Sequence, residues 1–129
     1  MLEPKLLIAD DDRDFRESLG EVFCRRGYET RLAADGQEAL EIVAQSNEIH
    51  LVILDIHMPR LSGLEALQQI RWNRSSSLPC ILMSAKLDEK IVLEAEPLKP
   101  ASLLSKPFTL RTLTTTVETV LRTSYGWEI

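Results

Sequence analysis

The sequence predicts an α/β fold: a five-stranded parallel sheet, doubly wound, with five helices covering its two faces. Two observations carry this prediction. Short apolar segments of strand length alternate five times with segments in which apolar residues recur at helical spacing. Most of the strand-like segments are apolar almost throughout, which is typical of parallel strands buried on both faces. A length of 129 residues and an apolar fraction of 44% fit one globular domain.

The first half of the chain holds three predicted strands and two predicted helices. The strands are Lys5–Ala9, Tyr28–Ala33 and Ile49–Asp55. The apolar positions of the two helices are Phe15, Leu19, Val22 and Phe23, then Ala39, Leu40 and Val43. Asp12 is placed to cap the first helix and Gly27 to end it, and Asp35 can cap the second helix.

The second half alternates in the same way. Its predicted strands are Leu78–Ala85 and Ala101–Ser105, with a loop at residues 75–77 before the first of them. The apolar positions of the third and fifth helices are Leu64, Leu67 and Ile70, then Leu110, Leu113, Val117 and Leu121. A short fourth helix is predicted at Asp88–Glu96, and Pro97 should stop it, because proline lacks the backbone N–H that a helix interior needs.

Composition excludes several classes of function. The net charge is −5 and the basic residues form no block, Arg71 and Arg74 included, so direct nucleic-acid binding by this chain is not expected. No apolar run is long enough to span a membrane, and no signal peptide is recognisable, which predicts a cytoplasmic protein. Cys24 and Cys80 lack metal-ligand spacing, so we expect both to be reduced, buried thiols.

Polar residues gather where the predicted strands end. The first strand ends at Asp10 and Asp11, the third at Asp55, the fourth at Ser84 and the fifth at Lys106. The carboxyl ends of parallel strands meet at one edge of the sheet, so these side chains should converge there. Clustered carboxylates need a counter-charge, and Mg²⁺ prefers oxygen ligands of this kind. A carboxylate beside a cation, an ammonium and a hydroxyl can accept a phosphoryl group, and Asp55 is the best candidate.

Four motifs carry a family resemblance. "ADDD", "LVILDIHMPRLSG", "ILMSA" and "LLSKPF" resemble the receiver domain of two-component response regulators, and the match covers essentially the whole chain. The resemblance implies a flavodoxin-like sheet with strand order 2-1-3-4-5. It also implies a receiver domain at residues 1–123, followed at residues 124–129 by a C-terminal tail or the start of a linker.

The resemblance assigns a role to each residue at the strand ends. Asp55 corresponds to the phosphoacceptor, while Ser84 and Lys106 correspond to the hydroxyl and the ammonium that contact the phosphoryl group. The implied Mg²⁺ ligands are Asp10 (through water), Asp11, Asp55 and the backbone carbonyl of His57. The family also has a cis peptide bond at the position of Lys106–Pro107, and cis X–Pro bonds are a minority in proteins generally.

The function implied by the resemblance is that of a signalling switch. A sensor histidine kinase or a phosphotransfer protein would donate a phosphoryl group to Asp55, and the added charge would change a protein-interaction surface. An effector domain or a downstream protein would read that surface, and a weak homodimer is a further candidate partner. The chain would not be a turnover enzyme, since it would catalyse only its own phosphorylation and dephosphorylation.

Three residues depart from the family pattern, and the roles of two other side chains stay open. Leu103 stands where the family usually has an aromatic residue, and Pro97 and Pro100 lie in the same segment, so the surface that partners read should be unusual while the transfer site is intact. The His57 side chain is either a solvent-facing imidazole whose backbone alone matters or a group that flanks the phosphoryl site and tunes it. Lys86 is in a similar flanking position.

Two other functions stay open from the residues alone. The first is a Mg²⁺-dependent phosphohydrolase with an aspartyl intermediate, although that class usually carries its acids as DxD after the first strand. The second is a receiver fold that docks partners without responding to phosphorylation. Multiple turnover on a generic phosphoester would indicate the phosphohydrolase, and stoichiometric labelling would indicate the switch.

Overall fold

The predicted alternation of strands and helices is confirmed in the computed structural model, which describes residues 3–46, 48–73 and 77–129. The strands are β1 (Lys5–Ala9), β2 (Glu29–Ala33), β3 (Leu51–Asp55), β4 (Cys80–Ser84) and β5 (Ser102–Ser105). The helices are α1 (Arg13–Arg25), α2 (Gly36–Gln45), α3 (Gly63–Asn73), α4 (Glu89–Ala95), the 3₁₀ turn η1 (Glu96–Leu98) and α5 (Leu110–Tyr125). The strands pair in parallel in the order β2-β1-β3-β4-β5, as predicted.

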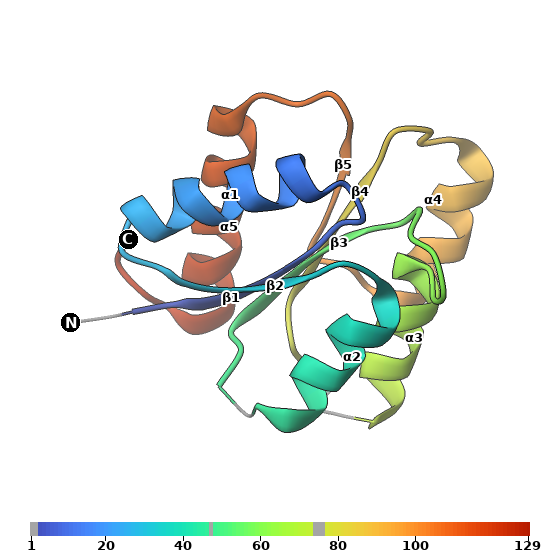
Figure 1. The fold of residues 1–129 in the computed structure, drawn as a ribbon, viewed down its shortest axis with the longest axis horizontal. Coiled ribbons are helices and arrows are strands. Elements are labelled where there is room, and N and C mark those ends of the chain that lie inside the picture. Colours follow the sequence, from blue (N-terminus) through green and yellow to red (C-terminus); the bar gives the residue numbers. More distant parts are fainter. Residues whose placement is uncertain (1–2, 47, 74–76) are drawn as a thin grey trace.

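Helices cover both faces of the sheet (Figure 1). α1 and α5 lie on one face, where Leu19, Phe23 and Val117 pack against the apolar side chains of β1 and β3. α2 and α3 lie on the other face with Ala39 and Leu67 in its core, and α4 adds Ala95. β3 is the central strand and is buried along its whole length. The acidic residue at its end is therefore carried by a fully buried strand in the middle of the sheet.

Several predicted strands are one or two residues too long at their N-terminal ends. Ile49 and Leu78 are buried, which explains why the apolar pattern includes them, but both lie in the loops that lead into β3 and β4. A hydrophobic pattern indicates which residues are buried, but it does not show whether a buried residue also pairs with a neighbouring strand. Most of the loop predicted at residues 75–77, and Arg74 before it, lie outside the described residues.

A side-chain cap is found at the start of each of the five α-helices, because the first N–H groups of a helix have no partner within it. The capping residues are Asp12, Asp35, Ser62, Asp88 and Thr109, which accept from the backbone N–H groups of Phe15, Glu38, Glu65, Ile91 and Thr112. Asp12 therefore caps α1, as predicted. α4 ends at Ala95, directly before the turn that contains Pro97, so the early stop predicted for this helix is also confirmed.

The two cysteines differ in environment. Cys80 is buried in β4, and this burial raises the pKa of its thiol to about 12. Cys24 is exposed on α1, so the prediction that both thiols are buried is wrong for this residue. The adjacent Phe23 fills the core position on that turn of the helix, which leaves Cys24 on the outer side. The two thiols form no disulfide.

An aromatic cluster closes the end of the sheet opposite the strand carboxyl ends. The Tyr125 hydroxyl donates to the His50 carbonyl at 2.7 Å, and Lys5 N–H donates to His50 Nδ1 at 3.0 Å. Trp127 stacks on Tyr125 with ring centroids 4.6 Å apart and lies edge-on to His50. His50 therefore has a structural role: it joins the end of α5 to the start of β3.

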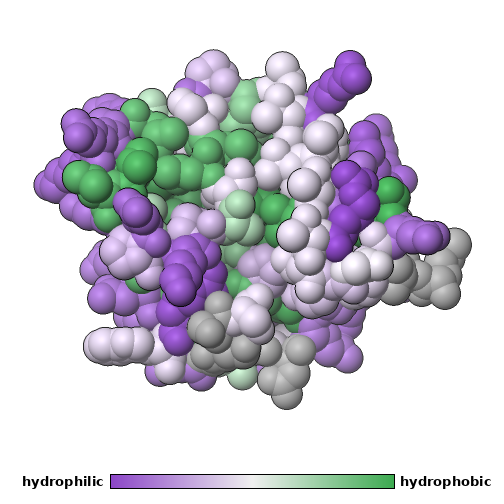
Figure 2. Space-filling view, turned by 180° about the vertical axis from the view of Figure 1, so that it is seen from behind, coloured by the Kyte–Doolittle hydropathy of each residue, from purple (hydrophilic) through white to green (hydrophobic). Residues whose placement is uncertain are grey.

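An apolar area marks one part of the surface. Figure 2 shows hydrophobic side chains gathered at its upper left, which is the side of the molecule where Figure 1 places α4. Val92 and Leu93 on α4 are exposed. None of the helices in the described ranges combines the length and the apolar character needed to cross a bilayer.

Candidate functional site

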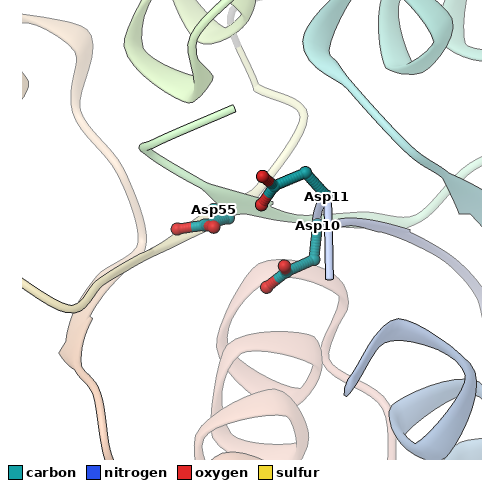
Figure 3. Close-up of side chains that lie close together, drawn as sticks. All are labelled: Asp10, Asp11 and Asp55. Atoms are coloured by element: carbon teal, nitrogen blue, oxygen red, sulfur yellow. The ribbon is translucent and has the colours of Figure 1, made fainter. Parts of the chain in front are cut away.

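Three carboxylates meet at the carboxyl edge of the sheet, as the strand-end positions predicted. Asp10 and Asp11 follow β1, and Asp55 is the last residue of the neighbouring strand β3. Figure 3 shows their side chains drawn together, and one carboxylate oxygen of each lies within 4.8 Å of the others. Asp10 and Asp55 are buried, while Asp11 is exposed. Burial of two like charges so close together is costly unless a cation compensates them.

Lys106 supplies one cation. Its Nζ lies 2.7 Å from Asp10 Oδ2 and 3.6 Å from Asp55 Oδ2, so the ammonium bridges the two buried carboxylates. The lysine follows β5, and the peptide bond to Pro107 is cis, which confirms that prediction. The Phe15 ring lies under the ammonium, with Nζ 4.4 Å from the ring centroid, and Phe108 packs edge-on against Phe15. This cation–π contact adds to the positioning of Lys106.

Backbone and guanidinium groups hold the Asp10 segment in place. The N–H of Asp12 donates to Asp10 Oδ1 at 2.9 Å, and Lys106 occupies the other carboxylate oxygen. Arg16 on α1 donates from Nη1 to the Asp10 carbonyl at 2.7 Å. Both carboxylate oxygens of Asp10 are therefore already bound within the protein. The exposed Asp11 carboxylate instead faces the space between the three acids, called the shared space below (Figure 3).

The environment of Asp55 favours its protonated form. Burial raises the pKa of this carboxyl, and the charges of Asp10 and, more weakly, Asp11 raise it further. The charge of Lys106 and a hydrogen bond from His57 N–H oppose this rise in the pKa without cancelling it. One ammonium among three carboxylates thus leaves the site short of positive charge, and a further cation would oppose the rise in the pKa of Asp55.

Ser84 and His57 form a second polar pair beside Asp55. Ser84 ends β4, next to the end of β3, and its side chain is fully buried. Its Oγ accepts from Lys86 N–H at 3.0 Å and lies 3.1 Å from His57 Nε2. The His57 ring therefore contacts a residue of the predicted site, which favours the flanking role over a purely solvent-facing imidazole. The Lys86 side chain is exposed.

The loop after Asp55 is held close to the strand. Gly63 N–H donates to the Ile56 carbonyl at 2.9 Å. A Cβ at position 63 would come within 2.2 Å of the Asp55 carbonyl oxygen, so only glycine fits there without moving the backbone. The "MPRLSG" segment thus folds back over the end of β3, and this fixes the place of His57 beside Asp55.

The donor set fits a hard divalent cation. Three carboxylates with oxygens in mutual reach offer oxygen ligands only, which suits Mg²⁺. With all three ionised, three negative charges face one ammonium, an excess of two that a divalent cation would neutralise. Sequence reasoning found these residues but missed Phe15 and Arg16. Their helical pattern indicates only a core-facing and a polar position, and no sequence signal connects them with the site.

The fold and site together define a class: a doubly wound parallel α/β domain with an acid cluster and a lysine at its carboxyl edge. The family model described as the response regulator receiver domain matches residues 6–118. The chain is 37% identical over 120 residues to response regulator RR06 of Streptococcus pneumoniae, and this match covers 93% of the chain and 54% of the relative. It is 40% identical over 121 residues to response regulator MprA of Mycobacterium leprae, covering 92% of the chain and 51% of the relative.

Solved structures agree with this placement. The receiver domain of the Francisella response regulator 1452 superposes with a TM-score of 0.86 at 29% identity, over 95% of this chain and 99% of that one. Response regulator TrrA of Thermotoga maritima, solved with Mg²⁺ and BeF, gives a TM-score of 0.81 at 33% identity, over 92% and 99%. The chain therefore belongs to the response regulator receiver domain family. It spans about half the length of the curated relatives it matches.

Proposed function

We propose that this chain is a phosphoacceptor receiver domain that takes a phosphoryl group onto Asp55 with the help of Mg²⁺. The observation that carries the proposal is the bridging of Asp10 and Asp55 by Lys106 within a cluster of three carboxylates. The family match and the Mg²⁺–BeF complex of TrrA support the same reading. Mg²⁺ would be held by the carboxylates of Asp10 (through water), Asp11 and Asp55, together with the His57 carbonyl.

The proposed reaction is a phosphoryl transfer between two protein side chains. A carboxylate oxygen of Asp55 attacks the phosphorus of a phosphohistidine, the P–N bond breaks, and its electron pair stays on the leaving imidazole. Lys106 Nζ, 3.6 Å from Asp55, is within reach of the oxygens that gain charge, and the Ser84 hydroxyl beside it can donate to another. A bound Mg²⁺ would neutralise the remaining negative charge of the incoming group.

The donor and the reader of the signal complete the proposal. A sensor histidine kinase or phosphotransfer protein supplies the phosphoryl group, and an effector domain or downstream protein responds to the phosphorylated state. We place this exchange in the cytoplasm. The chain acts as a switch rather than as a turnover enzyme, and its chemistry is limited to its own phosphorylation and dephosphorylation.

The direct test is incubation with acetyl phosphate and Mg²⁺ followed by intact-mass measurement. The chain should gain one phosphoryl group, which hydroxylamine should remove because it is an acyl phosphate. The variant Asp55→Asn should stay unlabelled under the same conditions. Equal labelling of this variant would show that Asp55 is not the acceptor, and many turnovers on p-nitrophenyl phosphate would indicate a phosphohydrolase instead.

A further inference from the structure

The contact between His57 and Ser84 suggests a role for the imidazole that goes beyond flanking the site. Ser84 Oγ is fully buried and has two polar neighbours, Lys86 N at 3.0 Å and His57 Nε2 at 3.1 Å. A hydroxyl offers one proton and two lone pairs. The Lys86 N–H can only donate, so it occupies one lone pair. The direction of the second hydrogen bond then determines where the hydroxyl proton lies.

Burial decides between the two possible directions. If His57 Nε2 carried a proton and donated it, the Ser84 hydroxyl proton would have no acceptor among the described residues. A buried donor without a partner is costly. If Nε2 accepts instead, every group of Ser84 is paired, and the imidazole carries its proton on Nδ1. The geometry therefore indicates that the Ser84 hydroxyl donates its hydrogen bond to His57 Nε2 in this state.

We propose that His57 is a positioning residue that retains the Ser84 hydroxyl and so opposes the phosphorylated conformation. The inference rests on the proposed function, in which the same hydroxyl proton donates to a phosphoryl oxygen on Asp55. Ser84 has one proton, so it cannot serve the imidazole and the phosphoryl group at once. The charged oxygen is the stronger acceptor and wins the competition, but the hydrogen bond to His57 must first be lost. His57 is exposed, so its ring can turn away into solvent.

The expected effect of removing this competition is a change in affinity for a phosphoryl analogue. A neutral hydrogen bond contributes enough to change a binding constant by about 2- to 10-fold. The variant His57→Phe keeps a ring but has no acceptor, and it should bind beryllofluoride about 2- to 10-fold more tightly than the parent at saturating Mg²⁺. The variant His57→Gln keeps an acceptor oxygen and should remain closer to the parent.

A double-mutant cycle separates this role from a general effect of the substitution. In a Ser84→Ala background the hydroxyl is gone, so His57→Phe should no longer change the beryllofluoride affinity. A long-range ¹H–¹⁵N spectrum of the parent should show the Nδ1–H tautomer of His57 without beryllofluoride and loss of that signature with it. An equal gain in both backgrounds, an unchanged or weaker affinity in His57→Phe, or an Nε2–H tautomer in the parent would overturn the proposal. If the parent and all variants fail to bind beryllofluoride, the proposed function itself fails, whereas a normal parent affinity without the coupling overturns only the role of His57.

Discussion

Lys106 Nζ lies closer to Asp10 than to Asp55, at 2.7 Å against 3.6 Å, although Asp55 is the proposed acceptor. In this state the ammonium is mainly the partner of a fully buried carboxylate. Lys106 therefore has two roles. It compensates the charge of Asp10, and its ammonium would be within reach of a phosphoryl group attached to Asp55.

The first prediction concerns the structural duty of Lys106. The variant Lys106→Met should lower the free energy of unfolding in EDTA by about 3 kcal/mol, because it leaves a buried carboxylate without its cation. Thermal or urea unfolding would measure this loss. Lys86→Met is the matched control, since this exposed lysine lies near the same edge and its loss should change stability by less than about 0.5 kcal/mol. Equal effects of the two substitutions would contradict the role assigned to the ion pair.

The second prediction concerns Asp55 and pH. The folded protein raises the pKa of Asp55 above its ordinary value of 3.8, chiefly through burial. The folded state therefore holds this proton to a higher pH than the unfolded state does. Stability is lost as pH rises from the unfolded pKa through the folded pKa. Without metal at neutral pH, Asp55→Asn should thus be more stable than the parent and unfold at a higher Tm.

Unfolding curves in EDTA from acid to neutral pH would test this. The advantage of Asp55→Asn should be small below pH 3.8, grow over the window above it and then level off. Added Mg²⁺ should stabilise the parent more than the variant, because binding to the folded state adds to its stability. A variant that is less stable than the parent at neutral pH, or a difference that does not change with pH, would show that burial and neighbouring charges do not disfavour the ionised form of Asp55.

The third prediction separates the two acids after β1. Asp11 is exposed toward the shared space, whereas Asp10 is already bound to Lys106 and to the backbone of Asp12. Asp10→Asn should lower Mg²⁺ affinity by about 10-fold, as expected for an indirect ligand, and Asp11→Asn should lower it further. Asp12→Asn is the control, since asparagine also caps helices well, the Asp12 side chain caps α1, and the substitution keeps the backbone N–H that binds Asp10. NMR titration with Mg²⁺ would give the affinities, and an unchanged affinity in Asp11→Asn would exclude direct ligation.

The fourth prediction concerns the ring under Lys106. Phe15→Leu keeps an apolar side chain but removes the cation–π contact, which is worth about 1 kcal/mol at a partly buried site. The variant should lose about this much stability and bind beryllofluoride more weakly, because the ammonium is less well held. Phe108→Leu removes the edge-on ring but leaves the contact between Phe15 and Lys106, so its beryllofluoride affinity should change less. The reverse order of the two variants would contradict the positioning role of Phe15.

The site residues could be predicted because they occupy the ends of apolar strands, where a parallel sheet brings them together. Asp10, Asp55 and Lys106 are far apart in the chain, but each directly follows or ends a recognisable strand. Phe15 and Arg71 could not be predicted in this way. Phe15 has the spacing of a core residue, and that spacing does not reveal that its ring also faces an ammonium. Arg71 on α3 donates to three backbone carbonyls, two in loops and one at the end of the short turn η1, and such segments carry no periodic pattern.

Arg71 matters for how a signal would travel from the site. It extends from α3 and donates to the carbonyls of Leu78, Leu98 and Lys99 at 2.7, 2.9 and 3.2 Å. The connection between α4 and β5 is thereby tied to α3. Two of these hydrogen bonds, to Leu98 and Lys99, hold that connection, so it has less freedom to follow a movement of Ser84. This restraint acts on the connection that leads into β5, the strand in which Leu103 replaces the usual aromatic residue.

The last prediction is that phosphorylation changes the α4 face only weakly. Leu103 is half-buried, and it packs against the core between the sheet and α2, α3 and α4. When Ser84 moves toward a phosphoryl oxygen, leucine can fill part of the space behind β4 by a rotamer change, but it buries less area than an aromatic ring and has no hydroxyl to present. The coupling should lie near the low end of the roughly 1–3 kcal/mol of allosteric systems. Amide spectra with beryllofluoride should therefore show large shifts near Asp55, Ser84 and Lys106 and small ones at residues 88–103.

Two variants make this prediction decisive. Leu103→Tyr restores a ring and a hydroxyl at this position, so it should enlarge the shifts at residues 88–103 while those near Asp55 stay similar. Leu103→Met, which conserves volume and flexibility, is the matched control and should resemble the parent. The exposed apolar side chains of α4 (Figure 2) form a surface that a second copy of the chain could bind. Sedimentation with and without beryllofluoride should therefore accompany the spectra. Large shifts across residues 88–103 in the parent, or dimerisation driven by beryllofluoride, would show that leucine transmits the signal as well as an aromatic residue does.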